Sequence, residues 1–97
     1  MEPPDGVPVQ ADLPSLLATG MRMVRERLRA SPGFSVYRSI QRQIEYLQAA
    51  VALGQSPDPE KIDSLTLSVY AAREFETSDP DFADVLFRVH YLAARLP

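Results

Sequence analysis

The stretch that decides the fold is residues 79–96, which read DPDFADVLFRVHYLAARL. Its apolar residues recur three and four positions apart, the spacing that places them on one face of an α-helix. That face consists of Phe82, Val85, Leu86, Val89, Leu92, Ala93 and Leu96. The preceding Asp79-Pro80-Asp81 is typical of a helix start, with an N-cap residue, a proline at the first helical position and an acid near the positive end of the helix dipole. We therefore expect a helix that buries one face.

Two helices are expected earlier in the chain. The first begins at Asp12, a good N-cap with Pro14 in the first turn, and ends before Ser31-Pro32-Gly33. The second begins at Phe34 or Ser35 and ends at Gly54, a natural C-terminal stop. Their apolar faces are formed by Leu13, Leu17, Val24 and Leu28 in the first helix and by Val36, Ile40, Ile44, Leu47 and Val51 in the second.

A third helix is expected to start at Asp58-Pro59-Glu60, which repeats the same start pattern. Its apolar stripe would be Ile62, Leu65, Val69 and Ala72. No alternating strand pattern competes with these assignments. Four amphipathic helices joined by short loops predict an all-α fold, a small antiparallel bundle of four helices. We expect residues 1–11, which are rich in proline and lack periodicity, to form a flexible N-terminal lead-in, and residues 12–97 to form the helical domain.

Length and composition argue against an enzyme. The chain has 97 residues, enough for one domain with a modest core and little room for a deep substrate cavity. It contains no cysteine, and its one histidine, His90, has no neighbouring pattern of metal ligands. Neither a glycine-rich phosphate loop nor a known catalytic motif occurs. We therefore expect no catalysis, no metal and no cofactor. The absence of a signal-peptide pattern and of a long apolar run favours the cytoplasm and no membrane contact.

Charge is unevenly distributed along the chain. The formal net charge is −3, and the acids concentrate in the second half. An acidic half disfavours nucleic acid and favours a basic protein partner. The arginines of the first two helices would also fit a helix-turn-helix DNA binder, whose affinity would fall steeply with salt. Arginine on a helix face is, however, usually solvated surface, so we expect no nucleic-acid partner.

The candidate binding surface lies between the third and fourth helices. It comprises five acids, Glu74, Glu76, Asp79, Asp81 and Asp84. Helix capping accounts for Asp79 and Asp81 but not for the other three. Phe75, between two of the acids, is expected to attach the turn to the core, and an ordered turn presents its carboxylates at low entropic cost. The pattern predicts a docking surface for a basic partner.

Two aromatic residues of the last helix, Phe87 and Tyr91, fall away from its main apolar face. They are four residues apart and so share one strip of the helix surface. Exposed aromatics next to arginine and acids have the composition of a binding hot spot. The alternative is that this helix is central and buries two faces. We retain both residues as candidate anchors for a protein partner.

The order and spacing of several short motifs resemble a known family. They are Pro32-Gly33-Phe34, then Ser39, Gln43 and Tyr46-Leu47, then Leu65-Thr66-Leu67, Ala72-Arg73-Glu74-Phe75-Glu76 and Thr77-Ser78-Asp79-Pro80-Asp81. Across roughly residues 13–92 the chain is similar to the small helical immunity proteins that neutralise NAD(P)-degrading toxins of bacterial type VI secretion systems. The resemblance implies a cytoplasmic protein that binds a cognate toxin domain and blocks its active site sterically, with no cofactor and no chemistry of its own.

Other functions remain open from the residues alone. A generic helical adaptor or a self-associating bundle would have the same composition and periodicity. Genomic context would separate these possibilities, because an immunity gene lies directly downstream of its toxin gene. The oligomeric state does not follow from the sequence.

Overall fold

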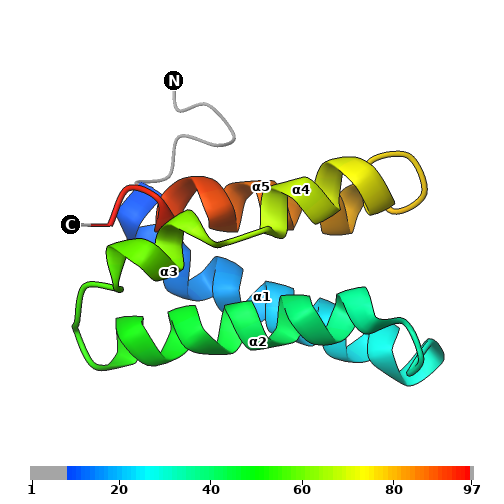
Figure 1. Ribbon diagram of the computed structural model, residues 1–97, viewed down its shortest axis with the longest axis horizontal. Coiled ribbons are helices and arrows are strands. Elements are labelled where there is room, and N and C mark those ends of the chain that lie inside the picture. Colours follow the sequence, from blue (N-terminus) through cyan, green and yellow to red (C-terminus); the bar gives the residue numbers. More distant parts are fainter. Residues whose placement is uncertain (1–8, 97) are drawn as a thin grey trace.

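The computed structural model describes residues 9–96 and shows an all-α fold (Figure 1). Its elements are α1 (Val9–Ala30), α2 (Ser35–Ala52), α3 (Pro59–Asp63), α4 (Leu67–Tyr70), the π-helical η1 (Ala71–Phe75) and α5 (Pro80–Ala93). α1 and α2 form one antiparallel pair, and the α4–η1 segment runs antiparallel to α5 in the other. α1 packs against both α2 and α5. The predicted four-helix arrangement is confirmed, with the third helix replaced by a broken segment.

The first helix starts earlier than expected. It begins at Val9 and not after Asp12, so Pro14 lies inside the helix. A proline inside a helix removes one backbone hydrogen bond, and this loss is tolerated near a helix end, where water can reach the freed carbonyl. Residues 1–8 of the expected lead-in lie outside the described residues.

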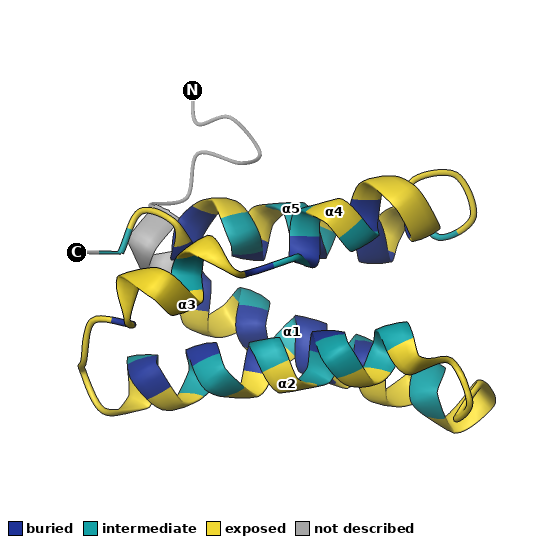
Figure 2. Cartoon of the chain, in the orientation of Figure 1, coloured by how far each residue is buried: buried dark blue, intermediate teal, exposed yellow. Residues whose placement is uncertain are grey.

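The predicted faces of α1, α2 and α5 form the core (Figure 2). The largest fully buried side chains include Leu13, Leu17, Val24, Ile40, Ile44, Leu47, Phe82, Leu86 and Val89. Other members of the predicted faces, such as Leu28, Val36 and Val51, are half-buried. The apolar periodicity therefore predicted which faces are buried in these three helices.

The local start and stop patterns around the α2–α3 loop are also confirmed. Gly54 has φ +65°, and its N–H donates to the Val51 carbonyl at 3.1 Å while the Gln55 N–H donates to the Ala50 carbonyl at 3.0 Å. This is a Schellman ending, which requires a left-handed residue. Asp58 is the N-cap of α3, because its carboxylate accepts the Glu60 N–H at 3.0 Å.

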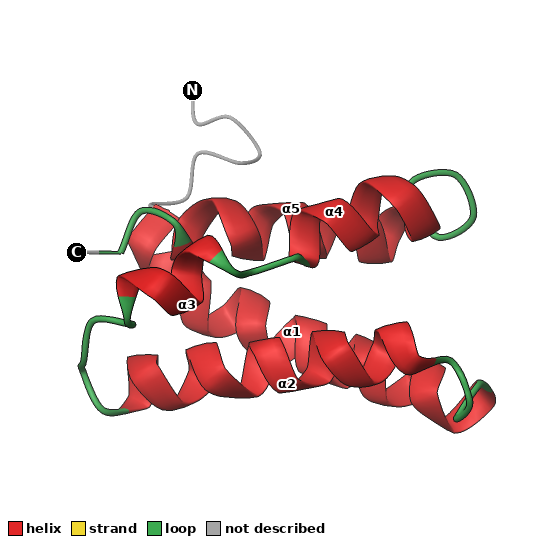
Figure 3. Cartoon of the chain, in the orientation of Figure 1, coloured by secondary structure: helices red, strands yellow, loops and turns green. Residues whose placement is uncertain are grey.

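The prediction of one continuous third helix was wrong. α3 ends at Asp63, and a new helical segment starts at Leu67 after a short connection (Figure 3). At 100° per residue, a single helix would point Leu65 and Leu67 about 200° apart, so it could not bury both. The break buries both, and Val69, expected in the core, is instead 45% exposed.

Two side chains from other helices hold the broken segment. The Gln43 amide of α2 accepts the Thr66 N–H at 2.9 Å and donates to the Thr66 hydroxyl at 2.8 Å. His90 of α5 accepts the Ser68 N–H through Nδ1 at 3.1 Å. These bonds satisfy backbone groups that the interrupted helix leaves open. They therefore set the position of α4 and of the η1 segment that leads into the acidic region.

Candidate partner-binding surface

Residues 74–81, which we call the acidic turn, are attached to an aromatic cluster at one end of the bundle. The cluster consists of Phe34, Tyr37, Phe75 and Phe82. The Phe75 ring is 3% exposed, stacks on Tyr37 with centroids 5.7 Å apart, and meets Phe82 edge-on at 5.0 Å. Such aromatic pairs add about 0.5–1.5 kcal/mol beyond area burial. The prediction that Phe75 attaches the turn to the core is confirmed.

An ion pair fixes the far end of the acidic turn. Arg27 of α1 donates from Nε to Asp79 Oδ2 at 2.6 Å and from Nη2 to Oδ1 at 3.0 Å, and both side chains are only about a quarter exposed. The guanidinium also lies 4.7 Å from the centre of the Phe82 ring. The hydrogen bond from Arg27 holds the pKa of Asp79 below its usual value, and the same bond raises the pKa of Arg27. This bidentate geometry is the strongest form of such a pair.

The role expected of Asp79 needs correction. Asp79 is the residue before α5, and its side chain makes no capping hydrogen bond of normal geometry, although the Phe82 backbone N–H also contributes to lowering its pKa. Its carboxylate is used by Arg27, which lies 52 residues away in the chain. Asp79 therefore stabilises the turn and presents little free charge to a partner.

The other predicted acids differ in how available they are. Glu74, Glu76 and Asp81 are exposed, and none of them has a basic group within ion-pair distance among the described residues. Asp84 is exposed as well but accepts a hydrogen bond from Arg88 Nε at 2.9 Å. The Ser78 hydroxyl donates to the Glu74 carbonyl at 3.0 Å, which adds order to the turn. Three free carboxylates thus stand on a rigid support.

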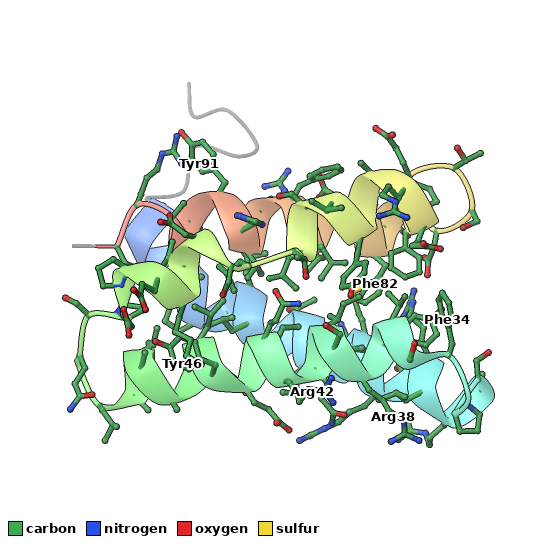
Figure 4. The ribbon with its side chains drawn as sticks, in the orientation of Figure 1. Phe34, Arg38, Arg42, Tyr46, Phe82 and Tyr91 are labelled. Carbon is green, nitrogen blue, oxygen red and sulfur yellow. The ribbon has the colours of Figure 1, made fainter. Side chains whose placement is uncertain are left out.

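The two predicted aromatic anchors occupy different environments. Phe87 is half-buried and packs against the core, as expected for a helix that buries more than one face. Tyr91 is 53% exposed, and the Arg95 guanidinium lies 3.5 Å from its ring centre. Tyr91 follows Asp81 by ten residues, about 15 Å along the helix, and Figure 4 shows it at the opposite end of the molecule from Phe34 and Phe82. The structure does not bring Tyr91 together with the acidic turn.

The described residues do not form a catalytic or metal-binding arrangement. No group of three metal-ligating side chains occurs in the part of the chain that the structure describes. His90 accepts the Ser68 N–H through Nδ1 and so holds α4, and burial lowers its pKa. Within the same residues, no helix is long and apolar enough to cross a bilayer. The fold and surface define a small helical binding protein with a rigid charged edge.

Comparisons with known proteins agree with this class. The Tsi6 family model matches residues 12–95. Immune protein Tsi6 of Pseudomonas aeruginosa is 32% identical over 75 residues, which are 77% of this chain and 79% of that protein. The solved structure of Tsi6 from Pseudomonas aeruginosa has a TM-score of 0.77 at 29% identity and covers 86% of this chain and 85% of that one. The solved structure of Tse6 in complex with Tsi6 has a TM-score of 0.79 at 28% identity, and the match covers 86% of this chain and 87% of that one.

The chain belongs to the Tsi6 family. The resemblance to small helical immunity proteins is thereby confirmed, and the family is one of immunity proteins and not of enzymes.

Proposed function

We propose that this protein is an immunity protein that binds the catalytic domain of a cognate toxin and blocks its active site sterically. The observation that carries the proposal is the acidic turn, whose free carboxylates Glu74, Glu76 and Asp81 stand on a support fixed by Phe75 and by the Arg27–Asp79 pair. A relative, Tsi6, has been solved in complex with Tse6. By analogy, this chain forms a complex with a protein partner of its own.

The order of the acidic turn lowers the cost of binding. A turn that is already ordered loses little conformational entropy on association. Its negative charge complements a basic cleft, such as one that binds nucleotide phosphates, and speeds the encounter. Inhibition of this kind requires a rigid surface and tight association, and no chemistry from the inhibitor. We further propose, from the resemblance, that the toxin degrades NAD(P), that a type VI secretion system delivers it, and that neutralisation takes place in the cytoplasm.

The direct test is co-expression with the toxin domain encoded beside this gene, scoring cell survival and NAD level. Survival with preserved NAD would support both immunity and the proposed substrate. Survival that depends on this chain, with NAD untouched in cells carrying the toxin alone, would retain immunity but change the toxin's chemistry. No protection by a folded, expressed protein would refute the proposal and favour a general adaptor.

A second experiment addresses the surface. The double variant Glu74→Lys, Glu76→Lys should keep its thermal stability, because neither carboxylate has an ion-pair partner among the described residues, and should bind the toxin clearly more weakly. The matched control is Glu45→Lys, Asp63→Lys, which makes the same change in net charge at exposed positions outside the acidic turn. Equal affinity for wild type and the Glu74, Glu76 variant would remove the acidic turn from the interface.

A further inference from the structure

A second polar feature lies away from the acidic turn, where the third segment is broken. A hollow of about 210 Å³ opens between α2 and the α3–α4 connection. We call it the basic notch. Its lining includes Ser39, Arg42, Gln43, Tyr46, Lys61 and Ser64. Arg42 and Tyr46 both belong to α2 (Figure 4).

The walls of the notch are held by hydrogen bonds that leave few groups free to move. Gln43 is bonded to Thr66 and also donates to the Ser39 hydroxyl at 3.2 Å. The Tyr46 hydroxyl accepts the Asp58 N–H at 3.0 Å, which draws the α3 loop against α2. The Lys61 ammonium lies 6.0 Å from the centre of the Tyr46 ring. The walls of the notch are therefore ordered, apart from the exposed side chains of Arg42 and Lys61.

Both charged side chains that line the notch are basic. Neither Arg42 nor Lys61 has a carboxylate within ion-pair distance among the described residues. The Ser64 hydroxyl already donates to the Lys61 carbonyl at 2.9 Å, and the Gln43 amide is occupied. The donors that remain are the guanidinium, the ammonium and the hydroxyls of Ser39 and Tyr46. The two cationic groups donate only, so the group that they favour is an anionic acceptor.

The size and openness of the notch favour a side chain over a free ion. Exposed cations bind a free anion weakly, because water competes and salt screens the attraction. A carboxylate delivered by a protein that is already bound meets the notch at a high effective concentration. We propose that the basic notch receives an Asp or Glu side chain of the toxin, an inference that rests on the proposed function.

The notch and the acidic turn are close enough for one partner to reach both. Ser64 in the notch and Glu74 are ten residues apart, and the steps from Leu67 onward are helical, so the chain between them spans at most about 21 Å. The α4–η1 segment connects the two regions directly (Figure 1). A standard interface covers about 800 Å² on each partner, a patch roughly 30 Å across. Two contacts of opposite sign within that patch fix the orientation of the partner and disfavour a toxin with the wrong charge pattern.

The test compares toxin affinity for wild type and for the double variant Arg42→Met, Lys61→Met. We expect at least about a 10-fold loss of affinity, mainly through faster dissociation. The matched control is Arg25→Met, Arg29→Met, which removes the same charge from α1, outside the notch. The control should bind within about twofold of wild type, and thermal melts should show that both variants are folded. Equal losses in both variants would attribute the effect to net charge and overturn the inference.

The outcomes separate this inference from the proposed function. A toxin that binds wild type and the notch variant equally well would refute the notch alone. A toxin that fails to bind wild type would refute the proposed function and this inference together. A charge exchange gives the positive identification: Arg42→Glu should weaken binding, and replacing the correct toxin acid by lysine should restore it. If no acid-to-lysine change on the toxin restores binding, the notch does not receive a carboxylate.

Discussion

The Arg27–Asp79 pair leads to a quantitative prediction for the variant Asp79→Asn. Asparagine keeps the size of the side chain and its ability to precede a helix, so the substitution isolates the loss of charge and of the bidentate bonds. Wild type makes two hydrogen bonds here, at 2.6 and 3.0 Å, between side chains about a quarter exposed. Hydrogen bonds to charged groups contribute about 1.5–3 kcal/mol, and exposed ion pairs about 0–1 kcal/mol. We expect a loss of about 1.5 kcal/mol in the free energy of unfolding.

The assay is urea denaturation of wild type, Asp79→Asn, Arg27→Met and the double variant, with Asp84→Asn as control. A loss of about 1.5 kcal/mol corresponds to a fall in Tm of roughly 6 °C or more for a domain of this size. The double variant should lose less than the sum of the single losses, with a coupling of about 1 kcal/mol. Asp84→Asn removes an i,i+4 pair whose side chains are 61% and 47% exposed, so it should cost no more than about 0.5 kcal/mol.

The pH dependence gives an independent check. The pKa of Asp79 is lowered in the folded state, chiefly by the hydrogen bond from Arg27. Its contribution to stability is therefore complete above the pKa of an unfolded aspartate, about pH 4, and is lost as the pH falls through the lower folded pKa. The stability difference between wild type and Asp79→Asn should shrink below about pH 4. Additive single losses, or equal losses for Asp79→Asn and Asp84→Asn, would refute the reasoning.

Three further predictions concern the scaffold. Gln43→Leu should lower the free energy of unfolding by about 2 kcal/mol, measured by urea denaturation. The substitution removes the side-chain oxygen that accepts the Thr66 N–H, so this N–H is left without a partner. Burial lowers the pKa of His90, whose Nδ1 accepts the Ser68 N–H, so its contribution to stability is complete above the unfolded pKa of about 6.5 and is lost as the pH falls below that value. His90→Asn, an acceptor that does not titrate, should not show this loss. Gly20→Ala should melt at or above the wild-type temperature, because helix propensity gains about 1 kcal/mol and the new Cβ meets side-chain ends alone, Ile44 Cδ1 at 3.2 Å and Val85 Cγ1 at 3.5 Å. Gly20→Val should be destabilising by about 1–3 kcal/mol, measured in the same melts.

Local chemistry explains what the sequence predicted correctly. The apolar faces of α1, α2 and α5 follow from helical periodicity, since each of these helices buries mainly one face. Asp58 and Gly54 were assigned correctly because a cap and a Schellman ending involve only neighbouring residues. The position of the acidic turn follows in the same way from Phe75, an apolar residue between acids.

The errors arise where a distant residue decides the local structure. The third helix is interrupted because Gln43 and His90 provide hydrogen bonds 23 and 22 residues away in the chain. The Asp79 carboxylate is bonded chiefly to Arg27, which the sequence grouped with the other arginines of the first two helices. The spacing of Leu65 and Leu67 did indicate the break, because one continuous helix cannot bury both side chains on the same face. The partners of the polar groups could not be identified without the fold.

Some charged residues of this protein stabilise the fold, and others are exposed without an ion-pair partner. This difference affects how such a protein can change its partner. Glu74, Glu76 and Arg42 have no ion-pair partner among the described residues, so substituting them should alter stability by no more than about 0.5 kcal/mol. The same substitutions alter the charge pattern that a partner meets, where each unpaired or repelling charge in an interface costs several kcal/mol. Recognition can therefore diverge rapidly on this fold while the core and the Arg27–Asp79 pair stay unchanged. That separation is what a protein with one specific partner requires.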